Sequence, residues 1–243
     1  MATNIIIPMA GLGSRLPPSR YGTIKPLIPI GGVPMIKLVV ESLNLSGRFI
    51  FIYRQNDFSY KLKRVLLEID KVAEILVLDK LTKGPVETCL SAKHLINNNS
   101  DLVIANADQI MRWSSVQFIK ATQKKELDGL IVTYTSTSHK NSFASLNNKG
   151  YVSRIKEKEV ISDIALVGIH YWRRGSDFVE SAEDMISQKS MDFGEYYIGP
   201  SYNQLIQKGL KIGVHHIPNY QYNPVGIPED LEKYKEELCK NII

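Results

Sequence analysis

The first thirty residues contain a short apolar strand that runs directly into a glycine-rich turn. Ile5–Ile7 are followed by Gly11 and Gly13, with Arg15 in the same loop and Lys25 shortly after it. Because glycine has no Cβ, such a turn can adopt positive φ angles and bring backbone N–H groups close to phosphate oxygens. The arginine and the lysine add positive charge. The loop therefore predicts a binding site for a polyphosphate, with a nucleoside triphosphate as the expected ligand.

Two common phosphate-binding motifs do not fit this loop. The dinucleotide fingerprint G-x-G-x-x-G needs a glycine at position 16, which is Leu16, and an acidic residue about twenty positions further on, whereas Glu41 lies further away. The Walker motif ends in Gly-Lys-Ser/Thr, which does not occur. Taken alone, Gly11-x-Gly13 also fits an ordinary turn, so its interpretation depends on the rest of the chain.

Length, charge and cysteine content narrow the class of protein. The chain has 243 residues, a length typical of one α/β unit, and we expect a single domain. Its net charge of +5 suits anionic ligands, but no run of five like charges predicts a nucleic-acid tail. Cys89 and Cys239 lack metal-site spacing, which indicates a reducing compartment. Without a basic segment or a long apolar run at the start, the sequence predicts a cytoplasmic protein with no membrane partner.

Apolar and amphipathic segments alternate through the first half of the chain. Short apolar runs, typical of strands buried on both faces of a parallel sheet, occupy Ile5–Ile7, Phe49–Tyr53, Ile75–Leu78 and Leu102–Ala105. Helical stretches are expected at Met35–Leu45, Tyr60–Ile69, Val86–Ile96 and Val116–Lys124. This order predicts a doubly wound sheet, whose ligands bind at the carboxyl ends of the strands.

The second half has more closely spaced strands. Expected strands are Leu130–Tyr134, Phe143–Leu146, Tyr151–Ile155, Leu166–Tyr171 and Ile212–Ile217. Helices are expected at Phe178–Ile186, at Tyr202–Lys208 and from Pro228 onward, where Glu229 and Asp230 suit a first turn. The pattern predicts an antiparallel or mixed continuation of the sheet, and the whole chain is expected to form an α/β fold.

The glycine-rich loop and several later segments resemble the sugar-1-phosphate nucleotidyltransferases, or nucleotide-diphosphate-sugar pyrophosphorylases. Gly11-x-Gly13-Ser14-Arg15 and Lys25-Pro26 match the family signature, and Pro8–Arg15 with Lys25–Pro29 resembles a bacterial branch found among capsule and surface-polysaccharide genes. Further motifs follow in the family's order: Thr82-Lys-Gly84, Glu87-Thr88, Asn106-Ala-Asp108-Gln109, Glu157-Lys158, Ser162, Gly168-Ile-His-Tyr171, Glu195-Tyr-Tyr197 and Gly226–Leu231. Each motif is weak alone, but the ordered set is specific.

The resemblance implies a Rossmann-like, three-layer α/β/α fold with a mixed central sheet. It implies one nucleotidyltransferase domain over residues 1–243, with a nucleotide-binding half at 1–125 and an acceptor-binding half at 126–243. The implied reaction transfers a nucleoside monophosphate from a nucleoside triphosphate to a phosphorylated small molecule, foremost a sugar-1-phosphate, and releases pyrophosphate for nucleotide-sugar and capsule biosynthesis. CTP is favoured because the branch includes cytidylyl transfer, and a non-sugar phosphate acceptor stays open. Neither nucleic acid nor membrane is an implied partner, and homo-oligomer formation is left open.

The resemblance also assigns roles to particular residues. Arg15 and Lys25 are the implied catalytic cations. Glu157, Lys158 and Gly168 are the implied acceptor-binding residues, although Glu159 stands where proline is usual and a solvated charge run explains Lys156–Glu159 equally well. The implied nucleotide-binding residues are Met9, Ala10, Gly11, Gly13, Ser14, Gly84 and Asn106.

Asp108 is the expected metal ligand. It follows the apolar run Leu102–Ala105, so its carboxylate should stand at the carboxyl end of a central strand, beside the glycine-rich loop. Mg²⁺ prefers oxygen ligands and is usually held by one or two carboxylates together with substrate phosphates. A helix-capping aspartate is the plainer alternative, and the loop together with the resemblance favours the magnesium role.

The late segment departs from the family's pattern. Many relatives have a second aspartate before a glycine-threonine-proline sequence, whereas here Asn223 is the nearest polar residue and Ile227 replaces the threonine. Two other functions therefore stay open at this point. A nucleotide-sugar-dependent glycosyltransferase typically shows D-x-D after a strand, where this chain has Asn106-Ala-Asp108. A non-catalytic nucleotide-binding relative would explain the missing aspartate.

Overall fold

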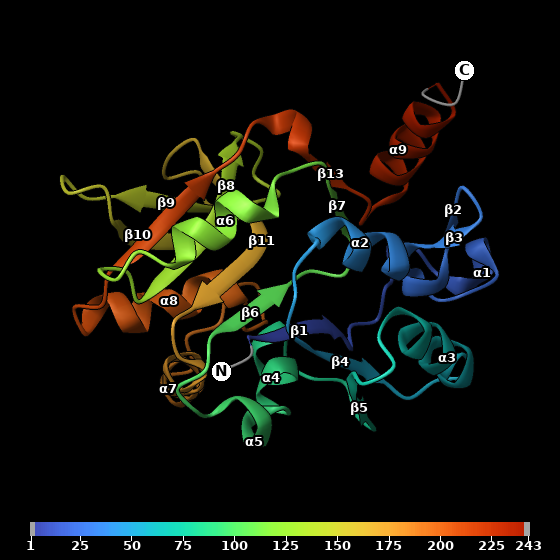
Figure 1. Cartoon of the computed structure of the whole chain (residues 1–243), viewed down its shortest axis with the longest axis horizontal. Coiled ribbons are helices and arrows are strands. Elements are labelled where there is room, and N and C mark those ends of the chain that lie inside the picture. Colours follow the sequence, from blue (N-terminus) through green and yellow to red (C-terminus); the bar gives the residue numbers. More distant parts are fainter. Residues whose placement is uncertain (1–2, 241–243) are drawn as a thin grey trace.

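A computed structural model describes residues 3–240 and shows a nine-stranded mixed sheet covered by helices (Figure 1). Its first part is parallel and has the strand order β6-β1-β4-β5. These strands are β1 (Asn4–Met9), β4 (Arg48–Arg54), β5 (Glu74–Leu78) and β6 (Leu102–Ala105). The expected α/β fold with a mixed central sheet is therefore confirmed.

Side chains alternate between the two faces of β1, and helices cover both faces. Ile6 packs in a cluster with Val86 of α4, whereas Ile5 and Ile7 pack in a second cluster with Ile36 of α2. The described helices are α1 (Pro18–Tyr21), α2 (Met35–Leu43), α3 (Ser59–Ile69), α4 (Pro85–Leu90), α5 (Lys93–Ile96), α6 (Ser115–Thr122), α7 (Gly175–Ser187), α8 (Ile198–Gln207) and α9 (Pro228–Lys240), with 3-10 turns η1 (Lys25–Leu27) and η2 (Asn219–Gln221). Burial on both faces explains the continuous apolar character of the strand.

The helix expected over Val86–Ile96 is two helices, α4 and α5. The Ser91 hydroxyl donates a hydrogen bond to the carbonyl of Thr88, and the N–H groups of Ser91 and Ala92 bond three residues back rather than four. Serine competes in this way with the helical backbone bonds. The sequence pattern located the helical segment correctly but not its interruption.

The second half extends the sheet through an antiparallel strand. β11 (Ile164–Trp172) pairs antiparallel with β6 and with β8 (Gly129–Thr135), and β12 (Ile212–His216) pairs parallel with β8. β9 (Ser142–Leu146) joins β11 at one residue pair, and β10 (Val152–Glu157) pairs with β9. The register of β11 on β8 shifts between Leu166 and His170, so the strand leaves β6 and turns towards β9.

Two short antiparallel pairs lie outside the main sheet. β2 (Pro29–Ile30) pairs with β3 (Val33–Pro34), and β7 (Gln109–Met111) pairs with β13 (Tyr222–Pro224). In Figure 1, β7 and β13 lie between the two halves, and α9 (red) stands beside β2 and β3. The β7–β13 pair therefore brings the C-terminal segment to the end of β6.

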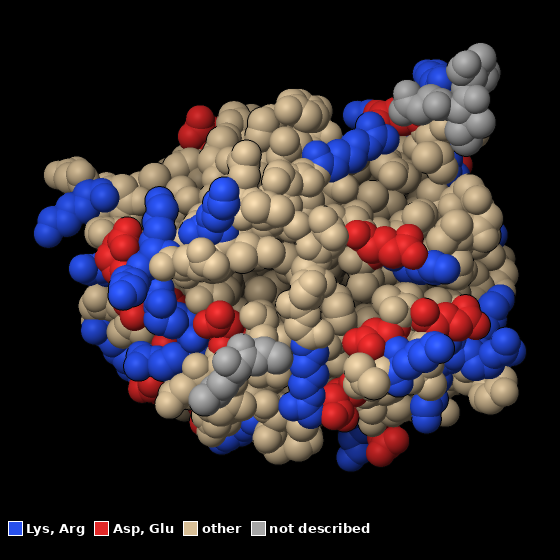
Figure 2. Space-filling view, viewed as in Figure 1, with Lys and Arg blue, Asp and Glu red and all other residues tan. Residues whose placement is uncertain are grey.

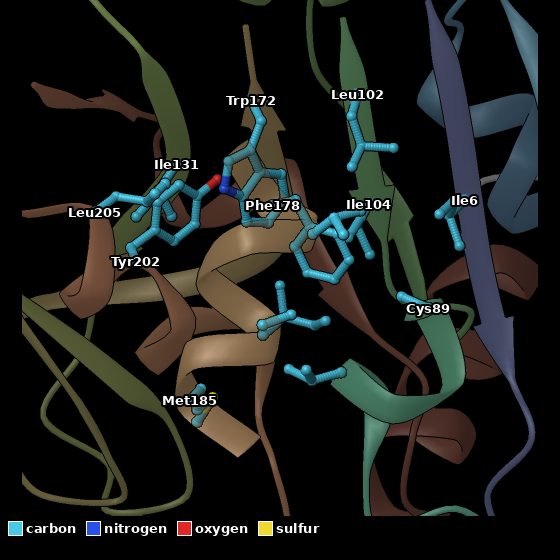
Figure 3. Close-up of a cluster of buried hydrophobic side chains, with 14 of the residues drawn as sticks. Ile6, Cys89, Leu102, Ile104, Ile131, Trp172, Phe178, Met185, Tyr202 and Leu205 are labelled. Carbon is cyan, nitrogen blue, oxygen red and sulfur yellow. The ribbon is translucent and has the colours of Figure 1, made fainter. Parts of the chain in front are cut away.

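An aromatic group fixes α7 and α8 against β11 (Figure 3). The rings of Trp172 and Tyr202 are stacked with centroids 4.4 Å apart, and Phe178 meets the indole edge-on at 5.0 Å. The Tyr202 hydroxyl donates to the carbonyl of Tyr171 at 3.0 Å. This packing attaches α7 and α8 to the second half of the sheet.

Charged side chains and helix lengths describe the surface of the protein. On the face in Figure 2, basic and acidic side chains are intermixed and the centre is largely uncharged, so this face shows no continuous basic stripe. Within residues 3–240, every helix is too short or too polar to cross a membrane.

Candidate functional site

The glycine-rich loop projects from the end of β1 and is anchored by one buried side chain. Gly11 and Arg15 are exposed, whereas Leu16 is fully buried and its N–H donates to the carbonyl of Gly13 at 2.9 Å. Gly13 has a φ of +63°, a conformation that glycine adopts without strain. A Cβ on Gly11 would meet no atom within 4 Å. The loop therefore leaves open space beside the exposed backbone that was predicted to approach phosphates.

Lys25 and Asp108 form an ion pair at the end of the parallel sheet. Lys25 begins η1, and its Nζ lies 2.5 Å from Oδ2 of Asp108, which stands between β6 and β7. Burial acts to raise the pKa of Asp108, but the charge and hydrogen bond of Lys25 and the charge of Arg15 outweigh it and lower the pKa. The fold thus brings together Arg15, Lys25 and an ionised Asp108.

The segment that follows β13 packs against the Lys25–Asp108 ion pair. The N–H of Val225 donates to the carbonyl of Asp108 at 2.9 Å, and a Cβ on Gly226 would lie 2.6 Å from Oδ2 of Asp108 and 3.5 Å from Nζ of Lys25. Asn223, opposite Ile110 in the β13–β7 pair, donates its side-chain amide to the carbonyl of Ile110 at 3.1 Å. Its amide nitrogen is therefore engaged by the neighbouring strand.

A second carboxylate, Asp230, lies within electrostatic range of Asp108. Burial is the main cause that raises the pKa of Asp230, and the charge of Asp108 raises it further. The sequence pattern gave Asp230 only a place in the first turn of a helix, because nothing in the spacing relates position 230 to position 108.

Asn106 and Gly168 join the end of β6 to the bend in β11. The N–H of Asn106 donates to the carbonyl of Gly168 at 3.0 Å, and the buried side chain of Gln109 donates to the same oxygen at 3.3 Å. Gly168 has a φ of +94°, and a Cβ there would collide with the side-chain amide of Asn106. The positive φ and the close packing therefore explain why position 168 is glycine. Contact between Gly168 and an acceptor stays a prediction.

Gly84 also faces protein backbone. It has a φ of +119° and precedes Pro85 at the start of α4, and a Cβ on it would lie 2.6 Å from the backbone nitrogen of Tyr196. The N–H of Tyr196 donates to Lys83 at 2.8 Å and its carbonyl accepts from Val86 at 3.1 Å. The carboxylate of Glu87 accepts from the N–H of Lys83 at 2.7 Å. This loop is thus held by the segment before α8, and its contact with a base stays a prediction.

The charged run at the end of β10 is not uniformly solvated. Glu157 is buried and accepts a hydrogen bond from the Ser142 hydroxyl, whereas Glu159 is exposed. Burial raises the pKa of Glu157, and the nearby charges of Asp192 and Glu195 raise it further, although the Ser142 hydrogen bond and the Lys158 charge act in the opposite direction. A plain surface charge run does not account for a buried glutamate.

Lys158 is held by two aromatic side chains, and only one of them had been singled out from the sequence. Its Nζ donates to the Tyr197 hydroxyl at 3.0 Å and lies 4.7 Å from the ring centroid of Phe193. The hydrogen bond from Lys158 to Tyr197 is the main cause that raises the lysine pKa, so the side chain stays charged. Glu195-Tyr-Tyr197 was noticed only as part of a family pattern, and Phe193 carried no signal.

The residues around Asp108 fit a magnesium ion shared with substrates. Among residues 3–240, no three His, Cys, Asp or Glu side chains gather as a complete metal site. Asp108 keeps 27% of its side chain exposed and is ionised, which suits an ion that takes one or two carboxylates and completes its shell with water and substrate phosphates. The donor set is therefore compatible with Mg²⁺ only when phosphates are present.

Comparison with known proteins gives a consistent result. A family model described as nucleotidyl transferase matches residues 4–231. The crystal structure of the nucleoside-diphosphate-sugar pyrophosphorylase from Vibrio cholerae RC9 superimposes with a TM-score of 0.81 at 24% identity, covering 96% of this chain and 99% of that chain. At that identity the superposition is a statement about fold.

Two sequence relatives are also informative. The bifunctional protein GlmU of Methanococcus maripaludis is 24% identical over 245 residues, which cover 98% of this chain but 55% of the relative. The chain thus spans about half the length of that protein. The 2-aminoethylphosphonate cytidylyltransferase of Lancefieldella rimae is 49% identical over 45 residues, which are 18% of each chain.

Proposed function

Since the chain belongs to the nucleotidyl transferase family, we propose that it transfers the nucleoside monophosphate of a triphosphate to a phosphorylated small molecule. The observation that carries this proposal is the Lys25–Asp108 ion pair beside the glycine-rich loop, closed from the other side by Gly226. Three segments far apart in the sequence thereby place two cations and one carboxylate around one space.

In the proposed reaction, an oxygen of the acceptor phosphate attacks the α-phosphorus. The new bond joins the acceptor oxygen to that phosphorus, the bond to the β-phosphate oxygen breaks, and pyrophosphate leaves with the electron pair. An acceptor phosphate is already close to doubly charged because its second pKa is about 6, so no general base is required. Backbone N–H groups at Gly11 and Gly13 would bind the phosphates, and Arg15 and Lys25 would stabilise the charge that develops.

Asp108 would hold Mg²⁺ once nucleotide is bound. The ion, when present, neutralises phosphate charge and orients the triphosphate. Before that, Lys25 occupies Oδ2 of Asp108, so we propose that Lys25 shifts towards the phosphates when the ion binds. Metal binding is therefore expected to be weak without nucleotide.

For the substrates, we propose CTP with a sugar-1-phosphate, and as a second candidate CTP with a non-sugar phosphate or phosphonate. The second candidate is supported by the partial match to a 2-aminoethylphosphonate cytidylyltransferase. We further propose a role in surface-polysaccharide synthesis and a cytoplasmic location, where nucleoside triphosphates are available. The role in surface-polysaccharide synthesis is supported by the resemblance of the N-terminal motifs.

The test is a substrate panel with pyrophosphate release as the readout. Four nucleoside triphosphates are combined with sugar-1-phosphates, aminoalkyl phosphates and phosphonates, with Mg²⁺, and products are identified by mass spectrometry. We expect release only when nucleotide and acceptor are both present, and strongly reduced release with the Asp108→Asn variant. If no combination releases pyrophosphate, the proposal is wrong. In a parallel assay with nucleotide-sugars, hydrolysis or sugar transfer would instead favour a glycosyltransferase. Nucleotide binding in a titration, without turnover in either assay, would favour a non-catalytic relative.

A further inference from the structure

A tight turn between α7 and α8 carries an exposed aromatic residue in a strained conformation. Asp192 and Glu195 exchange two backbone hydrogen bonds of 3.0 Å each, so Phe193 and Gly194 are the two central residues of the turn. Their φ angles are +50° and +81°. Turns with two positive φ angles usually carry Asn-Gly, because a bulky side chain in that region is disfavoured.

The ring of Phe193 is not used in a hydrophobic core. The residue is 69% exposed, yet its ring centroid lies 4.7 Å from Nζ of Lys158. Tyr197 contacts the same ammonium through its hydroxyl at 3.0 Å and its ring at 5.1 Å. A lysine side chain has large rotamer freedom, and two aromatic contacts restrict where its charge can lie.

The segment 192–197 also contacts the loop on the nucleotide side. Tyr196 forms backbone hydrogen bonds with Lys83 and Val86, and it approaches Gly84 so closely that no Cβ fits there. The backbone that follows the turn is therefore also held by the loop before α4. A ring mounted on such a support can hold an ammonium group in a defined position.

We propose that Phe193 is a positioning residue, which holds the ammonium of Lys158 where the phosphate of the acceptor binds. The inference rests on the proposed function, because it gives Lys158 the task of binding that phosphate. In this interpretation, the strained backbone conformation of an exposed phenylalanine serves acceptor binding rather than folding. Removing the ring leaves Lys158 charged but free to sample other rotamers, which weakens acceptor binding.

The first experiment separates binding from folding by two substitutions of Phe193. Phe193→Leu keeps an apolar side chain and loses the ring, and it is expected to raise the KM for the acceptor about 2- to 5-fold, the range of an exposed cation–π contact. The KM for the nucleotide is expected to stay unchanged, and Phe193→Tyr to restore the acceptor KM. Tyr60→Leu, which removes an aromatic residue that is 77% exposed on α3, is the matched control.

Phe193→Asn distinguishes a binding role from a structural one. Asn-Gly is the favoured sequence for this turn, so the variant is expected to unfold at a higher denaturant concentration and yet to show a raised acceptor KM. A residue that served only the fold would lose stability when replaced. If the acceptor KM is unchanged in both Phe193→Leu and Phe193→Asn, or the nucleotide KM rises equally, the proposal is wrong.

The second experiment does not depend on turnover. Lysines of the whole chain are methylated with a carbon-13 label, and the Lys158 signal is assigned by its loss in Lys158→Arg. We expect an upfield ring-current shift that decreases in Phe193→Leu and not in Tyr60→Leu. A Lys158 signal without that shift overturns the positioning role even if pyrophosphate release is observed. A shifted signal in a protein that fails the substrate panel contradicts the proposed function and leaves the contact established.

Discussion

Nζ of Lys25 lies 2.5 Å from Oδ2 of Asp108, although 83 positions separate the two residues in the sequence. Both side chains are partly buried, with 18% and 27% of their surfaces exposed. The pair keeps Asp108 ionised in the absence of any metal, because the lysine charge outweighs the effect of burial on the carboxyl pKa.

Asp108→Asn should abolish most turnover while the protein stays folded. The amide keeps the shape of the side chain but removes the negative charge that would bind Mg²⁺ and pair with Lys25. We expect a loss of about 10²- to 10³-fold in kcat, the range found when a strong electrostatic contact to a transition state is removed. Steady-state assays at saturating Mg²⁺ measure this loss. A variant with a nearly unchanged rate would contradict the metal assignment, and urea unfolding should show a cost of no more than about 3 kcal/mol.

Gly226→Ala should perturb the site although no charged residue is replaced. The added Cβ would lie 2.6 Å from Oδ2 of Asp108, so the carboxylate or the backbone must move. A displacement of about 1 Å near the reacting groups can cost about 10²-fold in rate. Measurement of kcat together with a crystal structure of the variant tests this expectation. Full activity with an unmoved Asp108 would contradict the prediction and would show that the backbone around Gly226 moves to accommodate the methyl group.

Gly11→Ala is the complementary substitution. A Cβ at this position meets no atom within 4 Å, so the free energy of unfolding should be unchanged. If the backbone at Gly11 approaches phosphates as proposed, the methyl group should raise the KM for the nucleotide. Denaturant unfolding and nucleotide titrations measure the two quantities separately. Loss of stability with an unchanged nucleotide KM would indicate that this glycine serves the fold alone.

His170 should make the protein less stable in mild acid. Its side chain is buried, Nδ1 has no hydrogen-bond partner among residues 3–240, and burial lowers the pKa to about 3. The unfolded chain takes up a proton below about pH 6.5 while the folded protein does not, so stability is full above that pH and falls by about 1.4 kcal/mol per pH unit below it. Urea unfolding at two pH values measures this slope. We expect the His170→Leu variant to lose this pH dependence of stability. His94 is an exposed histidine on α5, and the His94→Gln variant should keep the pH dependence.

Glu157→Gln should stabilise the protein near neutral pH. Burial is the main cause that raises the carboxyl pKa in the folded state. A raised folded pKa means that the contribution to stability is complete below the ordinary pKa and is lost as the pH rises through the folded value. The glutamine avoids this loss and can still accept a hydrogen bond from Ser142. Thermal unfolding should therefore favour the variant near pH 7.5 but not near pH 4. A variant equally destabilised at both pH values would contradict the burial argument.

The strands of the first half could be predicted from sequence because burial on both faces leaves a local pattern. Ile5–Ile7 and Leu102–Ala105 are continuous apolar runs, and both lie in strands of the parallel sheet. The order of strands and helices then placed Asp108 and the glycine-rich loop at the same edge, since carboxyl ends of parallel strands meet there. Local composition and topology were sufficient for these features.

The sequence by itself determined the class of fold and predicted a phosphate-binding loop and a metal-binding role for Asp108, because each has a signature within a few neighbouring residues. Only the tertiary structure decided which distant groups face these residues. The pairing of β13 with β7 brings Gly226 to Asp108, and a two-residue turn brings Phe193 to Lys158. Such contacts depend on register and on backbone conformations at positive φ. Neither leaves a periodic pattern in the chain.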